Sequence, residues 1–149
     1  MYLAGQKLNA EDLNLAPSMS EQEADVTTTS INYVFGSPAN SQPFTAPPSR
    51  RILVQVYAHQ ANSTVDNDSF TSFEVREGTS QTGTPVFIGS DNSAYRTSGV
   101  ANEIQAGTGK FTLVTLPVAG ATYTAWIRLK VTGGTGTWYR TAITVQPTF

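Results

Sequence analysis

Residues 110–149 read KFTLVTLPV-AGA-TYTAWIRLKV-TGGTG-TWYRTAITVQPTF, three apolar-rich runs separated by two short breaks that contain glycine. Side chains of a β-strand point alternately to opposite faces, so a strand with one buried face shows apolar residues at every second position. The middle run shows this pattern at Tyr123, Ala125, Ile127, Leu129 and Val131. The last run places Tyr139, Thr141, Ile143 and Val145 on one parity, and Trp138, Arg140, Ala142 and Thr144 on the other. The stretch predicts an antiparallel meander of three strands.

Earlier segments carry the same signals. β-branched and aromatic residues predict strands at 26–35, 50–59, 69–76 and 85–88, with one more around 94–100. One face of the second of these is fully apolar: Ile52, Val54, Val56 and Ala58. Four prolines predict a loop at 36–49, and a long connection follows at 89–109. Seven or eight strands separated by turns predict an all-β fold, an antiparallel, jelly-roll-like β-sandwich, with a small closed barrel as the alternative.

The first 25 residues differ from the rest. They hold five acidic residues against a single lysine. Asn9 is a suitable N-cap for a short helical turn at 10–15, and Pro17 would end it, so an extended acidic linker should follow. We therefore divide the chain into an arm, 1–25, and a sandwich domain, 26–149. The arm would dock on a neighbouring subunit through Leu3, Leu8, Leu13 and Leu15; the alternatives are an arm that packs on its own domain or is disordered.

Composition excludes several classes of protein. The 149 residues suit one domain, and the net charge of −2 gives no general basic field for nucleic acid. No apolar run approaches the roughly 20 residues that cross a bilayer, and the first residues lack the basic and apolar regions of a secretory signal. Without cysteine, neither disulfides nor thiolate metal sites can form. We expect no membrane insertion and no nucleic-acid partner.

Candidate catalytic residues do not form a recognisable group. A Ser-His-acid triad would have to use His59, the single histidine, but no GxSxG motif accompanies it. Glu74 and Glu77 lie at or just beyond the end of one predicted strand, with Glu74 on the parity expected to face solvent, and Glu103 lies in a predicted loop. We therefore expect His59 to be an ordinary surface residue and the protein not to be an enzyme.

Polar turns offer weak metal candidates. Residues 66–68 (Asp-Asn-Asp) and 90–92 (Ser-Asp-Asn) supply closely spaced oxygen ligands, but neither has the glycine and distal glutamate of an EF-hand. Asn and Asp are also common in turns, where they bond to their own backbone. The glycine-rich 133–136 joins two strands and should be a hairpin turn that supplies positive φ. We expect no metal and no cofactor.

Two tryptophans with interleaved cations are the other notable feature. Trp126 and Arg128 share a parity in one run, and Trp138 and Arg140 share one in the next. Aromatic and arginine residues are enriched in subunit interfaces, and tryptophan can also stack on sugars. Three interpretations stay open: a subunit interface, a second core face with arginine stems over the rings, or a contact for a host surface glycan.

The opening residues Ala4-Gly5-Gln6-Lys7-Leu8-Asn9-Ala10-Glu11-Asp12-Leu13-Asn14 resemble a short motif, roughly AGQ-x-L-T/N-A-x-D/E-L-N. This motif is similar to the start of small structural proteins of tailed bacteriophages, especially those of actinobacterial hosts. The resemblance covers about eleven residues and departs from the commoner form at Asn9, where threonine is usual. It implies a non-enzymatic minor tail or virion-surface protein. Such a protein is expected to form a homo-oligomer, for example a trimer.

These observations lead to one functional expectation. The chain should be a virion structural protein, assembled in the host cytoplasm, which contacts other virion proteins and copies of itself. We favour a minor tail component over a capsid-decorating or head protein. The alternative is a carbohydrate- or receptor-binding module in which Trp126 and Trp138 form the stacking platform.

Overall fold

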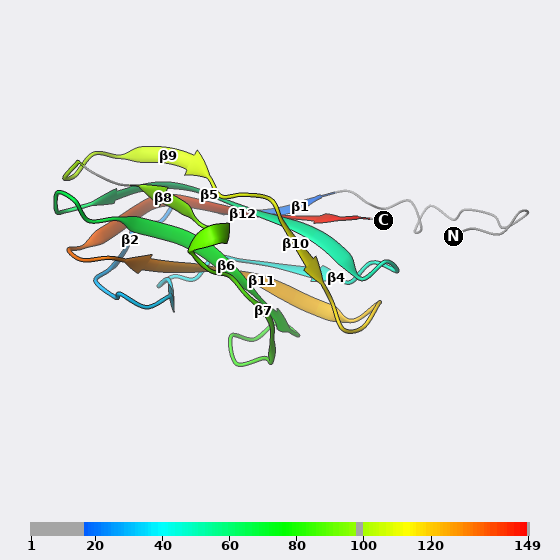
Figure 1. The fold of residues 1–149 in the computed structure, drawn as a ribbon. Coiled ribbons are helices and arrows are strands. Elements are labelled where there is room, and N and C mark those ends of the chain that lie inside the picture. Colours follow the sequence, from blue (N-terminus) through cyan, green and yellow to red (C-terminus); the bar gives the residue numbers. More distant parts are fainter. Residues whose placement is uncertain (1–16, 98–99, 149) are drawn as a thin grey trace, which may run out of the picture.

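The computed structural model describes residues 17–97 and 100–148, which form two antiparallel β-sheets packed face to face (Figure 1). Sheet A contains β1 (Ser18–Gln22), β2 (Val26–Thr28), β5 (Arg51–Asn62), β9 (Gln105–Thr108), β10 (Thr112–Thr115) and β12 (Gly136–Pro147). Sheet B contains β3 (Val34–Phe35), β4 (Ser41–Thr45), β6 (Ser69–Glu77), β7 (Pro85–Ile88), β8 (Tyr95–Thr97) and β11 (Thr122–Val131). A 3₁₀ turn, η1 (Asp91–Ser93), precedes β8. The predicted all-β antiparallel sandwich is confirmed.

The core lies between the sheets and follows the predicted alternation. On β5, the side chains of Ile52, Val54, Val56 and Ala58 are fully buried. On β11, the whole predicted face is buried against them: Tyr123, Ala125, Ile127, Leu129 and Val131. Burying a large apolar side chain contributes about 1.5–3 kcal/mol, so these two strands supply much of the stabilisation of the sandwich.

The last three strands do not form the predicted meander. β10 pairs with β5 in sheet A, β11 pairs with β6 in sheet B, and β12 returns to sheet A beside β5. The two glycine-containing breaks therefore arch from one sheet to the other, with positive φ at Gly120 and Gly134. The positive φ expected at 133–136 is confirmed, but the hairpin expected there is wrong. A short glycine-containing break can form either a hairpin within one sheet or an arch between two sheets. The alternation of buried residues on β11 does not show to which sheet the strand belongs.

A bulge in β12 changes the expected side-chain directions near its start. The pairing with β5 shifts between Trp138, opposite Gln60, and Arg140, opposite His59. The extra residue turns Trp138 into the core, where its side chain is fully buried, although alternation had grouped it with Arg140. The Trp138 Nε1–H donates to Gln60 Oε1 and Thr71 Oγ1, both at 2.7 Å, so the buried indole is satisfied.

The N-terminal segment contributes to the sandwich. β1 lies within the residues predicted to be an extended acidic linker, and it pairs with β12 from Ser18 opposite Val145 to Gln22 opposite Thr141. Within the described residues the sandwich therefore includes Ser18–Gln22, which the sequence-based division had placed in the arm. The predicted helical turn at 10–15 and the arm residues Leu3, Leu8, Leu13 and Leu15 lie outside the described residues.

Several short strands differ from the expectation. The described ranges hold twelve strands instead of seven or eight. The predicted strand 26–35 is divided between β2 in sheet A and β3 in sheet B. β4 lies within the predicted proline loop, because Pro43 occupies a strand at the margin of sheet B, where a missing N–H costs little. β9 lies within the predicted connection and pairs with β5.

Candidate functional site

The two tryptophans lie in different sheets and do not form a common platform. Trp138 is in the core, as described above, and Trp126 is on β11 of sheet B with 8% of its surface exposed. The Trp126 ring meets Phe35 edge to face, with ring centroids 5.7 Å apart. The stacking platform for sugars proposed from Trp126 and Trp138 is therefore wrong, because both rings are covered by protein. Arg128 lies beside Trp126 in sheet B, and Arg140 lies in sheet A.

Charged side chains are buried on the outer face of sheet B. Glu74 on β6, whose side chain is 4% exposed, forms ion pairs with Arg76 and with Arg128 Nη1, the latter at 2.8 Å. The Arg128 guanidinium lies over the Phe35 ring, 4.1 Å from its centroid, and also donates to the Tyr33 carbonyl. The expectation that Glu74 faces solvent is wrong. The rings of Tyr33 and Phe35, from the segment that precedes β4, pack against the cationic side chains of this face.

A second ion pair continues this face toward η1. Lys130 Nζ lies 2.7 Å from an Asp91 carboxylate oxygen and packs against the rings of Tyr33 and Phe70. The hydrogen bond from Lys130 lowers the pKa of Asp91 below its ordinary value. Burial, together with the bond that the Tyr33 hydroxyl donates to Asp91, raises the pKa of Tyr33. The 90–92 turn considered as a metal candidate thus uses its carboxylate within the protein.

Replacing Asp91 with asparagine should lower stability slightly and in a pH-dependent way. A carboxyl with a depressed folded-state pKa contributes stability above its unfolded pKa, and this contribution disappears as the pH falls through the folded pKa. The pair is partly exposed, so we expect a loss of at most about 1 kcal/mol at pH 7. Urea unfolding of both proteins from pH 7 to pH 2 should show two curves that converge at the acid end. Parallel curves over this range would contradict the role of Lys130.

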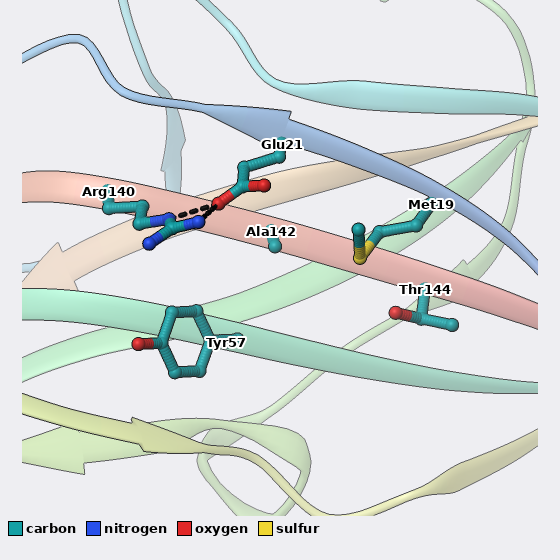
Figure 2. Close-up of a pocket in the computed structure, with 6 residues that line it drawn as sticks. All are labelled: Met19, Glu21, Tyr57, Arg140, Ala142 and Thr144. Carbon is teal, nitrogen blue, oxygen red and sulfur yellow. Dashed lines mark hydrogen bonds and ion pairs between the residues drawn. The ribbon is translucent and has the colours of Figure 1, made fainter.

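The outer face of sheet A, on the opposite side of the sandwich, contains a shallow hollow of about 250 Å³. Figure 2 shows its lining: Met19 and Glu21 from β1, Tyr57 from β5, and Arg140, Ala142 and Thr144 from β12. Arg140 forms an ion pair with Glu21, and its Nε lies 3.7 Å from Glu23. Glu21, Ala142 and Tyr57 lie in one row across three strands, so a small side chain at 142 forms the floor between larger neighbours.

His59 lies next to Tyr57 on the outer side of β5. Its Nε2 is hydrogen-bonded to the Tyr57 hydroxyl, and the centroids of the two rings are 5.3 Å apart. Within 17–97 and 100–148, no three His, Cys, Asp or Glu side chains gather in a way that could hold a metal ion. In the other metal candidate, the turn at 66–68, Asp68 forms an ion pair with Arg96 in which the nitrogen and oxygen atoms are 2.6 Å apart. In these two ranges there is also no helix of the length and apolarity that crossing a membrane requires.

The structure brings some sequence candidates together and separates others. Arg128 lies in the buried ion-pair group of sheet B, while Arg140 borders the hollow of sheet A. Sequence reasoning did not predict that Met19, Glu21 and Tyr57 line the same hollow as Arg140. A signal existed for Tyr57, because it lies on the parity of β5 opposite the four buried apolar residues. No comparable signal existed for Glu21, whose segment was interpreted as a linker.

Comparison with known proteins identifies the fold and no family. No protein-family model matches the chain, and no curated protein matches its sequence. The crystal structure of the infectious bursal disease virus VP2 subviral particle is similar to it, with a TM-score of 0.51 and 9% identity over 88% of this chain. A structure of the infectious bursal disease virus Gt strain gives a TM-score of 0.50 and 8% identity, again over 88% of this chain.

These similarities concern one part of each viral chain. The described sandwich corresponds to 32% of the first structure's chain and 33% of the second's. The chain thus spans about a third of the length of these relatives in structure. At such low sequence identity the likeness establishes a shared two-sheet fold and nothing about the site.

Proposed function

We propose that this chain is a non-enzymatic structural component of a virus particle. More narrowly, we propose a minor tail protein of a tailed bacteriophage, which assembles through its N-terminal arm and displays the sandwich on the particle surface. A capsid-decorating or head protein is the neighbouring alternative. In each case the protein would act by burying surface against other virion proteins and against copies of itself, in a particle assembled in the host cytoplasm.

The observation that carries this proposal is the sandwich itself, whose fold is shared with VP2 of a subviral particle over 88% of the chain. Two further observations support it. The opening residues 4–14 resemble those of small tailed-phage structural proteins, and this resemblance is independent of the fold. The charged side chains Glu74, Arg76, Arg128 and Lys130 form ion pairs within the protein on sheet B, while the outer face of sheet A keeps Met19 and Leu113 exposed, as is typical of an assembly surface.

The test is whether the chain belongs to purified particles. Particles of the virus that encodes it should be banded on a density gradient and examined by mass spectrometry, with an antibody against the sandwich for immunogold labelling. We expect the chain to sediment with the particles and the antibody to label the tail. Labelling of the head would favour the alternative position, and absence of the chain from the particles would refute the proposal.

Removing residues 1–16 should abolish incorporation and leave the sandwich folded. The deletion retains every described strand, since β1 begins at Ser18, so the strand pairing of the domain is untouched. We expect a drop in particle-associated protein of at least about tenfold, because the leucines of the arm would each contribute about 1.5–3 kcal/mol when buried against a neighbour. Circular dichroism of the truncated protein serves as the folding control. Normal incorporation of the folded, truncated chain would refute the proposed role of the arm in assembly.

A further inference from the structure

The two outer faces of the sandwich differ in what they leave exposed. On sheet B, even Phe70 and Glu74, which point away from the core, are 5% and 3% exposed. On sheet A, outward residues of the strands that end the sheet keep far more surface: Met19 on β1 is 60% exposed and Leu113 on β10 is 46% exposed. Sheet B exposes Ile88 in the same way, on β7 opposite Glu74, with 69% of its surface accessible. Large apolar side chains exposed on the same face of a sheet are typical of a surface that contacts another chain.

The exposed residues of sheet A belong to one surface. Leu113 on β10 is directly opposite Leu53 on β5, and Leu53 is opposite Gln146 on β12. The next row carries Met19 opposite Thr144, which is opposite Gln55. Phe111 directly precedes β10, two positions before Leu113, and is 55% exposed. The apolar residues thus lie along the rows that adjoin the hollow of Figure 2.

The chain enters the sheet at this surface. Ser18, the first residue of β1, is opposite Val145, one position from Gln146 in the row of Leu53 and Leu113. Residues 1–16 immediately precede this point and carry four leucines: Leu3, Leu8, Leu13 and Leu15. Sixteen residues can extend at most about 55 Å, which is enough to reach a neighbouring molecule.

We propose that the outer face of sheet A is the acceptor surface for residues 1–16 of a second copy of this chain. The inference rests on the proposed assembly role of the arm and names the surface that receives it. A return of the arm over its own face would require the chain to reverse direction at Pro17, directly before β1. Proline fixes its own φ and disfavours the helical conformation in the preceding residue, so a tight reversal directly before β1 is disfavoured.

Disulfide trapping between separate molecules tests this surface. The native chain contains no cysteine, so single substitutions give an unambiguous signal. Leu13→Cys provides the donor arm, Leu113→Cys the acceptor face, and Ile88→Cys a control on β7 of sheet B, where the side chain is 69% exposed. The variants are purified separately, mixed in pairs at about 10 µM and oxidised. Docking raises the local thiol concentration to about millimolar, so the Leu13–Leu113 pair should cross-link about a hundredfold faster than the Leu13–Ile88 pair.

Each other outcome overturns the proposal in a recognisable way. Rapid homodimers of Leu113→Cys alone would mean that two copies meet face to face without the arm. A monomeric internal disulfide in the double variant Leu13→Cys/Leu113→Cys would mean that the arm covers its own molecule. Equal, slow cross-linking of both pairs would mean that this face receives no arm, and Phe111→Cys provides a second acceptor position to verify that result.

The outcome is separable from that of the proposed function. Cross-linking is measured on the purified protein, while the proposed function is measured on particles. A chain found in particles that fails the disulfide test has another acceptor for its arm, whereas a chain that cross-links as expected and never enters particles assembles for another purpose. Peptide mapping of the reduced and non-reduced bands by mass spectrometry decides which thiols have reacted.

Discussion

Replacing Trp138 with alanine should lower the free energy of unfolding by about 3–5 kcal/mol, a large part of the stability of a domain of this size. The side chain is fully buried between the sheets, and its removal leaves a cavity that the surrounding strands cannot close. The loss also removes the indole donor to Gln60 and Thr71, so these polar side chains lose a partner in the core. Chemical denaturation followed by circular dichroism measures the effect.

A matched pair of substitutions separates the hydrogen bonds from the packing. Trp138→Phe keeps most of the ring and removes the donor, and should cost about 1–3 kcal/mol beyond the change in volume. Trp126→Phe is the control: among the residues that the structure describes, the buried Trp126 Nε1 has no hydrogen-bond partner, so its loss removes no bond. Equal destabilisation by the two substitutions would show that the bonds of Trp138 contribute nothing.

Replacing Glu74 with alanine should also destabilise the protein by about 3–5 kcal/mol, because it leaves two partly buried guanidinium groups without their shared carboxylate. Arg76 and Arg128 have side chains that are 18% and 17% exposed, so water can only partly replace the lost partner. Denaturant unfolding at pH 7 measures the loss. Glu77→Ala, at the exposed end of the same strand, is the control and should change stability by less than about 0.5 kcal/mol.

A compensating variant tests the cause of that loss. If the cost comes from unpaired buried charge, replacing all three side chains with apolar residues, as in Arg76→Met/Glu74→Leu/Arg128→Met, should recover most of the stability. If the triple variant is as unstable as Glu74→Ala, the packing of the glutamate stem would be responsible, and the ion pairs would have little net value.

Sequence periodicity correctly predicted the strands that have one face packed in the core. The alternation at β5 and β11 corresponds to fully buried side chains, and the short strand Pro85–Ile88 was predicted with its observed bounds. Burial between two sheets imposes this pattern on each strand separately, so it can be seen in a single segment. The pairing of strands is a property of two segments, and for that reason the meander predicted for 110–149 was wrong.

The opposite faces could not be predicted in this way. Alternation assumes that a strand has one wet side, but the outer side of β6 is covered by Phe35 and by the stem of Arg128, which comes from another strand. Glu74 was therefore expected in solvent. The bulge at Trp138 could not be predicted either. A single unpaired residue reverses the side to which the preceding residues of the strand point, and no sequence pattern marks its position.

The candidate site was predicted only in part for similar reasons. Arg140 was identified, but its partner Glu21 comes from a five-residue strand that forms by pairing with β12 and has little β propensity of its own. The cluster around Arg140 joins residues more than a hundred positions apart, and alternation within one segment carries no information about such a distance.

The position of β12 determines when this domain can fold during its synthesis on the ribosome. β12 lies at the centre of sheet A, with β1 and β2 along one side and β5 along the other, yet it is the last of these strands to be translated. Until it emerges from the exit tunnel, β1 and β5 have no strand between them. β1, β2 and one side of β5 therefore lack their partner until the end of the domain has been translated, and co-translational chaperones that shield these strands should raise the yield of folded protein.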